Sequence, residues 1–124
     1  MENRWTLSQP DHRADGGDAV IDVHAAKRIW LYSQPADLRK GFGGRYALAN
    51  NTLGVDPMNG DLFIFINRRR SLLKALRWDG TGLCVFSKRI AQGRFPNIFD
   101  HPRLSETLSP EQLERLIHAE AHIR

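Results

Sequence analysis

A run of five apolar residues restricts the fold more than any other feature of the chain. Residues 62–66 read Leu-Phe-Ile-Phe-Ile, and no polar residue among them marks a side that faces water. A short run of this composition, bounded by turn-forming residues, is typical of a strand covered on both faces. We therefore expect a fully buried strand of a sheet at these positions.

The residues that follow predict an antiparallel meander. Residues 67–71 interrupt the apolar run as a turn, and residues 72–78 resume with the composition of a strand. Residues 79–82, Asp-Gly-Thr-Gly, form a hairpin turn before a third strand at 83–89. The aromatic and branched segment 28–32 is a candidate fourth strand. Alternation divides the second strand into two faces, with Lys74, Leu76 and Trp78 on one and Leu73, Ala75 and Arg77 on the other.

Two helices are expected beside this sheet. The first follows Pro35 and has apolar residues at helical spacing from residue 38 to 49, although three glycines weaken it. The second begins at Ser109 and Pro110, an N-cap serine followed by proline at the first helical position. Its apolar stripe is Leu113, Leu116 and Ile117, and in the preceding loop Phe95, Ile98 and Phe99 are expected to pack on the sheet. We therefore predict an α+β fold, a small antiparallel sheet of three to four strands flanked by two helices.

The positive charge of the chain is concentrated in its middle. Residues 27–94 contain thirteen Lys and Arg against four Asp, a net of +9, whereas residues 1–26 have a net of −3 and residues 96–124 a net of −2. Such self-repulsion favours binding to a polyanion, most commonly nucleic acid, with ordinary solvated surface charge as the alternative. We expect residues 1–20 to be a disordered lead-in and residues 21–124 to form a single basic domain.

The composition also indicates a cellular compartment. The single Cys84 excludes an intramolecular disulfide framework and fits a reducing cytosol. No stretch approaches the roughly 20 apolar residues of a membrane span, and the first residues lack the apolar core of a secretory signal. We expect a cytoplasmic protein that associates with the nucleoid when it binds DNA, and no membrane partner.

The basic residues suggest where nucleic acid binds. Arginine donates paired hydrogen bonds to phosphate oxygens and to guanine edges, and a two-stranded ribbon fits the major groove. A basic hairpin tip is therefore a plausible contact with DNA. A solvated turn is the alternative. A second basic cluster lies beside the glycines of the first helix, which match no nucleotide-binding fingerprint. The candidate nucleic-acid-binding residues are Arg68, Arg69, Arg70, Lys74, Arg77, Lys88 and Arg89, with Arg39 and Lys40 in the second cluster.

The sequence gives no support to catalysis, to a metal site or to a cofactor. Asp79 is best explained by a turn in which its side chain bonds its own backbone. His118 and His122 are four apart on the last helix but have no evident third ligand. Cys84 is most simply a small buried apolar residue. We therefore expect a protein that is not an enzyme.

Several motifs, in one order along the chain, resemble a known family. They cover roughly residues 27–117 and are Asp37-Leu38-Arg39-Lys40-Gly41-Phe42 with Gly44, Asp56-Pro57, Gly60, residues 62–65, Asn67-Arg68-Arg69, Lys74, Trp78-Asp79, Gly82-Leu83, Lys88-Arg89, Gly93-Arg94-Phe95 and residues 108–113. With them the chain resembles the TnpB-type accessory proteins, the second open reading frame products of bacterial insertion sequences of the IS66 class. Gly43 and Arg45 depart from the family pattern, which more often has an acidic and an apolar residue there.

The resemblance implies a small non-catalytic protein encoded beside a separate transposase. Taken with the basic surface, it leads us to expect a DNA-binding accessory factor for transposition, with the terminal repeats of the element as one candidate binding site and the transposase of the same element as a partner. The alternative is a protein-interaction module that recruits or activates the transposase through an acidic surface on it. RNA binding is a third hypothesis, and the apolar residues make it the weakest because they look committed to a core.

Overall fold

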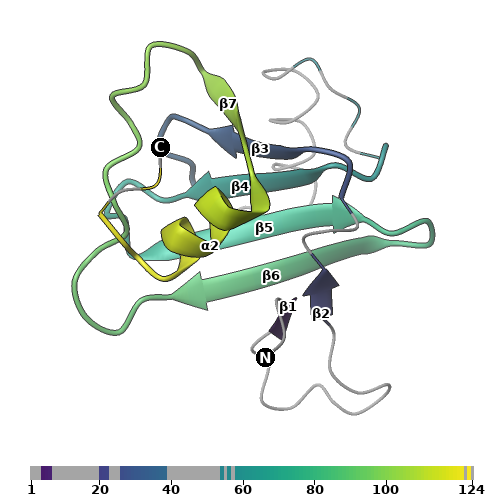
Figure 1. Cartoon of the computed structure of the whole chain (residues 1–124), viewed down its shortest axis with the longest axis horizontal. Coiled ribbons are helices and arrows are strands. Elements are labelled where there is room, and N and C mark those ends of the chain that lie inside the picture. Colours follow the sequence, from purple (N-terminus) through teal and green to yellow (C-terminus); the bar gives the residue numbers. More distant parts are fainter. Residues whose placement is uncertain are drawn as a thin grey trace.

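The computed structural model describes residues 4–6, 20–22, 26–38, 54, 56, 58–121 and 123. Its main feature is a five-stranded sheet with the strand order β6-β5-β4-β3-β7 (Figure 1). The strands are β3 (Ile29–Tyr32), β4 (Leu62–Ile66), β5 (Leu72–Trp78), β6 (Leu83–Arg89) and β7 (Ser105–Leu108). A separate two-stranded sheet pairs β1 (Arg4–Thr6) with β2 (Val20–Asp22). The other residues of the expected lead-in lie outside the described residues, so its disorder stays a prediction.

The predicted meander is confirmed. β4, β5 and β6 are joined in antiparallel order, and Leu73 pairs with Ile66 on one side and Lys88 on the other. This register places Leu73, Ala75 and Arg77 on one face of the sheet and Lys74, Leu76 and Trp78 on the other, as alternation predicted.

The prediction of an entirely antiparallel sheet is wrong at β3. This strand runs parallel to β4, with Ile29 beside Leu62 and Leu31 beside Ile64. A parallel pair requires a long crossover, and residues 33–61 supply one. The indole N–H of Trp30 donates to Asp61 at 3.0 Å, which fixes β3 against the start of β4.

The predicted number of three to four strands is also wrong, because β7 adds a fifth. Residues 105–108 read Ser-Glu-Thr-Leu and have weak strand propensity of their own. They form a strand by pairing antiparallel with β3, with Leu108 opposite Ile29. Tertiary pairing therefore determines this element. The described residues contain one helix, and the first predicted helix falls mainly on residues 39–53, outside them.

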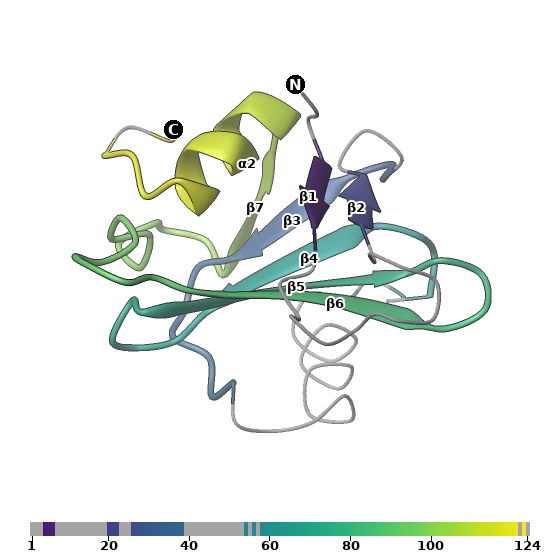
Figure 2. The same cartoon turned by 90° about the horizontal axis from the view of Figure 1, so that it is seen from below.

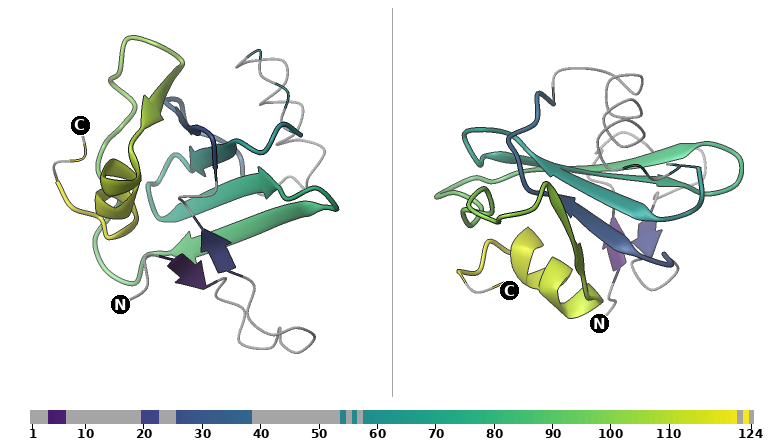
Figure 3. Two further views of the ribbon diagram at one scale, coloured as in Figure 1. Left: turned by 45° about the vertical axis from the view of Figure 1, so that its right-hand side comes forward. Right: turned by 90° about the horizontal axis from the view of Figure 1, so that it is seen from above.

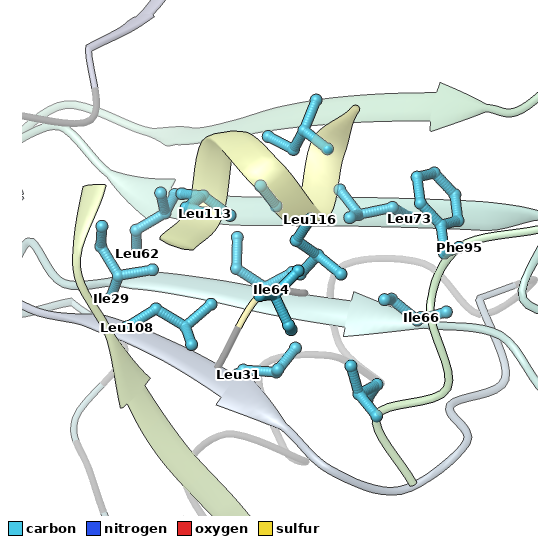
Figure 4. Packing of buried hydrophobic residues seen from close by; sticks show 14 of the residues in the cluster. Ile29, Leu31, Leu62, Ile64, Ile66, Leu73, Phe95, Leu108, Leu113 and Leu116 are labelled. Atoms are coloured by element: carbon cyan, nitrogen blue, oxygen red, sulfur yellow. The ribbon is translucent and has the colours of Figure 1, made fainter. Parts of the chain in front are cut away.

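The central strand β4 is buried along its whole length, as its composition predicted. All five of its residues have 0% of their surface exposed. Leu62, Ile64 and Ile66 face a core shared with the helix α2 (Pro110–Ile117), which lies across one face of the sheet (Figures 2 and 4). Phe95 and Ile98 of the loop after β6 are fully buried in the same core.

The opposite face of the sheet has its own apolar cluster. Phe63 and Phe65 of β4 pack there with Leu76 of β5 and with Ala36 and Leu38 from the segment that leaves β3. The two views of Figure 3 show α2 on one side of the sheet and this segment leaving β3 toward the other. The sheet therefore divides the molecule into an α2 face and an opposite face.

The predicted C-terminal helix is confirmed together with its cap. The Ser109 hydroxyl accepts from the Gln112 N–H at 3.1 Å, and the Gln112 side chain accepts from the Ser109 N–H at 2.8 Å. At the other end, Ala119 has a φ of 61°. Its N–H donates to Leu116, and the next N–H donates to Arg115, which is the hydrogen-bond pattern of a Schellman motif. An alanine therefore occupies a left-handed position that usually holds glycine.

Replacing Ala119 by glycine should stabilise the protein. Removing the Cβ relieves the left-handed strain, and the greater freedom of glycine in the unfolded chain offsets part of the gain. We expect Ala119→Gly to raise the free energy of unfolding by about 0.5–1 kcal/mol in urea denaturation. Ala121→Gly is the control, since Ala121 does not have a positive φ. Equal effects of the two substitutions would contradict this account of the helix end.

Candidate nucleic-acid interface

The turn between β4 and β5 presents three consecutive arginines. We call residues 67–71 the basic tip. Arg68 and Arg69 are exposed, whereas Arg70 is half-buried and adopts a φ of 57°. The Asn67 side-chain oxygen accepts from the Ser71 N–H at 2.9 Å and from the Leu72 N–H at 3.1 Å. One asparagine therefore closes the turn that carries the arginines.

The loop after β6 supports the basic tip from the side. The Ile90 N–H donates to the Ser71 carbonyl at 2.9 Å, and the Phe95 N–H donates to the Arg70 carbonyl at 2.8 Å. Phe95 is fully buried, so this loop is anchored in the core. A turn held by its own side chain and by a neighbouring loop is preorganised, which lowers the ordering cost of binding a ligand.

A hollow of about 490 Å³ lies between the basic tip and the segment that leaves β3. Leu72 at its base pairs with Arg89 across β5 and β6, which brings a third arginine to the same place. The Ala36 N–H donates to the Ile66 carbonyl at 3.0 Å and fixes the other wall. The residues that line the hollow are Pro35, Ala36, Asp37, Leu38, Asn67, Arg68, Arg69, Leu72 and Arg89. We call this feature the arginine hollow.

The predicted binding residues are only partly brought together. Arg68, Arg69 and Arg89 border the arginine hollow. Lys74 lies on the same face, and its ammonium group donates to the Leu38 carbonyl at 3.3 Å, next to the hollow. Arg70 completes the basic tip, and its backbone carbonyl accepts a hydrogen bond from the Phe95 N–H.

Two of the predicted residues lie on the α2 face instead. The Lys88 ammonium group donates to the Ile117 carbonyl at 2.8 Å, where a cation also interacts favourably with the end of the helix. The Arg77 side chain donates through Nε to the Gly60 carbonyl at 3.3 Å. Both make contacts within the protein, separated by the sheet from the arginine hollow. Arg39 and Lys40 lie outside the described residues.

Sequence reasoning missed the wall made by residues 35–38. In the sequence, Pro35 only marks the start of a predicted helix, and nothing indicates that Pro35 and Asp37 line a hollow with the basic tip. Their position follows from the parallel pairing of β3 with β4, which the sequence pattern did not reveal. The apolar residues of this segment were the available signal, since β4 needs cover on both faces.

Asp79 is held in its turn, as the sequence predicted. Its side chain accepts from the N–H groups of Thr81 at 2.8 Å and Gly82 at 3.0 Å, and from the Thr81 hydroxyl at 3.0 Å. These bonds, the Thr81 N–H first, lower the pKa of Asp79 from 3.8 to about 2. Cys84 is half-buried rather than buried, and its thiol donates to Asp79 at 3.4 Å. Burial is the main cause that raises the pKa of this thiol.

The described residues contain neither a cluster suited to a metal ion nor a membrane-spanning helix. Among the described residues, no group of three or more His, Cys, Asp or Glu side chains could hold a metal ion. His118 is exposed, and His122 lies outside the described residues. The same part of the chain contains no helix that is long and apolar enough to cross a membrane.

Comparison with known proteins identifies one family and two similar proteins. The family described as IS66 Orf2 like protein matches residues 27–121. Two proteins of Sinorhizobium fredii (strain NBRC 101917 / NGR234), named uncharacterized protein y4jC and uncharacterized protein y4hO, are similar to the chain. The first is 35% identical over 79% of this chain and 83% of its own length. The second is 40% identical over 55% of this chain and 59% of its own length. No solved structure matches.

The pKa of Asp79 gives a test of the hairpin turn. Because the folded-state pKa lies below its ordinary value, the carboxylate stabilises the fold fully above about pH 3.8, and this contribution is lost as the pH falls towards 2. We expect NMR titration to place the Asp79 carboxyl group near 2, and Thr81→Val to move its pKa towards 3.8. A pKa of 3.8 in the unmodified protein would contradict the hydrogen bonding described.

Proposed function

The chain belongs to the family of IS66 Orf2-like proteins, and on this premise we propose that it is a DNA-binding accessory factor for the transposition of its insertion sequence. The family indicates a role associated with transposition. DNA binding is our inference from the arrangement of the basic residues, and we propose that the factor itself performs no catalysis.

The observation that supports DNA binding is the grouping of Arg68, Arg69 and Arg89 around one hollow. All three side chains are exposed, and within the described part of the chain no ion pair involves them. Their charges lie in the central segment of the chain with its net charge of +9. Exposed guanidinium groups without carboxylate partners are suited to phosphate oxygens, which they bind by paired hydrogen bonds.

The geometry favours contacts with the DNA backbone. The basic tip is the turn that joins β4 to β5, and Arg89 ends β6 opposite Leu72, the first residue of β5. Arginines that meet phosphates position a protein on DNA without reading its sequence directly. We therefore propose that these three residues set the affinity, and that any preference for the terminal repeats depends on further contacts.

The test removes the three charges of the hollow. We expect Arg68→Gln, Arg69→Gln and Arg89→Gln together to weaken binding to a labelled duplex and to flatten its dependence on salt. The slope of log K against log salt should fall by about 1 for each arginine that contacts a phosphate. Fluorescence anisotropy over a salt series measures both effects.

The control for this test is Arg115→Gln, which removes an exposed charge from α2 on the other face. It should leave the salt slope unchanged. An unchanged slope in the triple variant would remove the arginine hollow from the account. If the unmodified protein binds neither the terminal repeat nor a scrambled duplex, but co-purifies with the transposase in high salt without DNA, the chain is a protein-interaction module instead.

A further inference from the structure

We propose that the arginine hollow takes one unpaired nucleotide of a DNA strand. The phosphate would lie among Arg68, Arg69 and Arg89, and the base would lie against the apolar side chains beneath them. This inference rests on the proposed function and names the form of DNA that the site accepts. A protein with such a site distinguishes an open or single-stranded end from a closed duplex.

The size of the hollow supports this proposal. Its volume of about 490 Å³ lies within the range of roughly 300–1,000 Å³ that is usual for small-molecule sites. A duplex is a wide cylinder with its bases stacked inside, so it can touch the rim of such a hollow but cannot enter it. A nucleotide that has left the stack can enter, because its base and its phosphate are both free to turn towards the protein.

The lining has the two chemical characters that a nucleotide requires. Pro35, Ala36, Leu38 and Leu72 supply apolar surface, and the charged residues of the lining are three arginines and one acidic residue, Asp37. Phosphate contacts alone would need only the charges, and these are equally available on a flat surface. Apolar side chains gain from contact with the faces of an unstacked base, as in pockets that receive extruded bases.

The hollow is also prepared before any ligand binds. Its two walls are joined to the sheet by backbone hydrogen bonds, from Ala36 to Ile66 on one side and from Asn67 to Leu72 on the other. The Asn67 side chain forms three further hydrogen bonds, two with Ser71 within the basic tip and one with the Leu72 N–H. The arginines on the rim therefore need little rearrangement of the backbone to meet a phosphate.

The experiment compares two DNA hairpins of the same stem sequence, one blunt and one with a short unpaired overhang of thymidines. Binding of each is measured by fluorescence anisotropy at one salt concentration. We expect the overhang to bind about tenfold more tightly, the lower part of the range for one base packed on protein. A short oligothymidylate should compete with the overhang hairpin for binding to the protein.

Two variants test whether the hollow causes this preference. Ala36→Leu adds an apolar side chain at a buried position in the wall of the hollow, and it should weaken binding of the overhang hairpin more than binding of the blunt hairpin. Leu72→Ala removes part of the apolar base from a half-buried position, and it should reduce the preference. Ala121→Leu, an equal addition at an exposed site beyond α2, is the matched control and should change neither affinity.

The outcomes separate this inference from the proposed function. Equal, salt-dependent binding of the two hairpins would overturn the single-nucleotide proposal and leave duplex binding intact. A preference for the overhang that survives both Ala36→Leu and Leu72→Ala would also overturn it, because the unpaired strand would then bind elsewhere. If neither hairpin binds the unmodified protein, the proposed function fails together with this inference.

Discussion

The burial of β4 on both faces determines the rest of the structure. Each of its five residues is fully removed from solvent, so other parts of the chain have to cover both faces of the strand. One cover is α2, whose Leu113 and Leu116 pack on the face that carries Ile64 (Figure 4). On the other face, Ala36 and Leu38 join the cluster around Phe63 and Phe65. The arginine hollow lies between this second cover and the turn in which β4 ends. The site is therefore a consequence of the same apolar run that specifies the sheet.

The basic tip combines charge with local rigidity. Three adjacent arginines repel one another, and the contacts described for this turn do not involve their guanidinium groups. Asn67 provides such contacts through its side chain, and the loop anchored by Phe95 provides another through the backbone of Arg70. The Asn67 side chain and the backbone thus stabilise the turn, which leaves the arginine side chains available for binding. Lys88 shows the opposite arrangement, since its charge is used within the fold to bind the end of α2.

Local signals in the sequence predicted much of the fold, and long-range pairing explains most of what they missed. The β4–β6 meander, the turn at Asp79 and the capped helix α2 each follow from residues close together in the chain. The parallel direction of β3 and the existence of β7 depend on contacts between distant segments, which composition does not specify. For the site, charge identified Arg68, Arg69 and Arg89, but it also grouped them with Arg77 and Lys88. Strand alternation already separated Arg77 from Lys74, and applying it to β6 would have separated Lys88 from Arg89. The apolar residues of the segment 35–38 indicated that it covers β4, but its position beside the basic tip could not be predicted, because it follows from the direction of β3.

The central claim is that DNA meets the face opposite α2, at the hollow between the basic tip and residues 35–38. The most direct test is to follow the backbone amides of the ¹⁵N-labelled protein by NMR while the overhang hairpin is added. The account predicts that the largest changes occur in residues 36–38, 67–72 and 89–90, and that α2 is unaffected. Changes concentrated in α2 and β7, with the basic tip unchanged, would place the DNA on the other face and contradict the account.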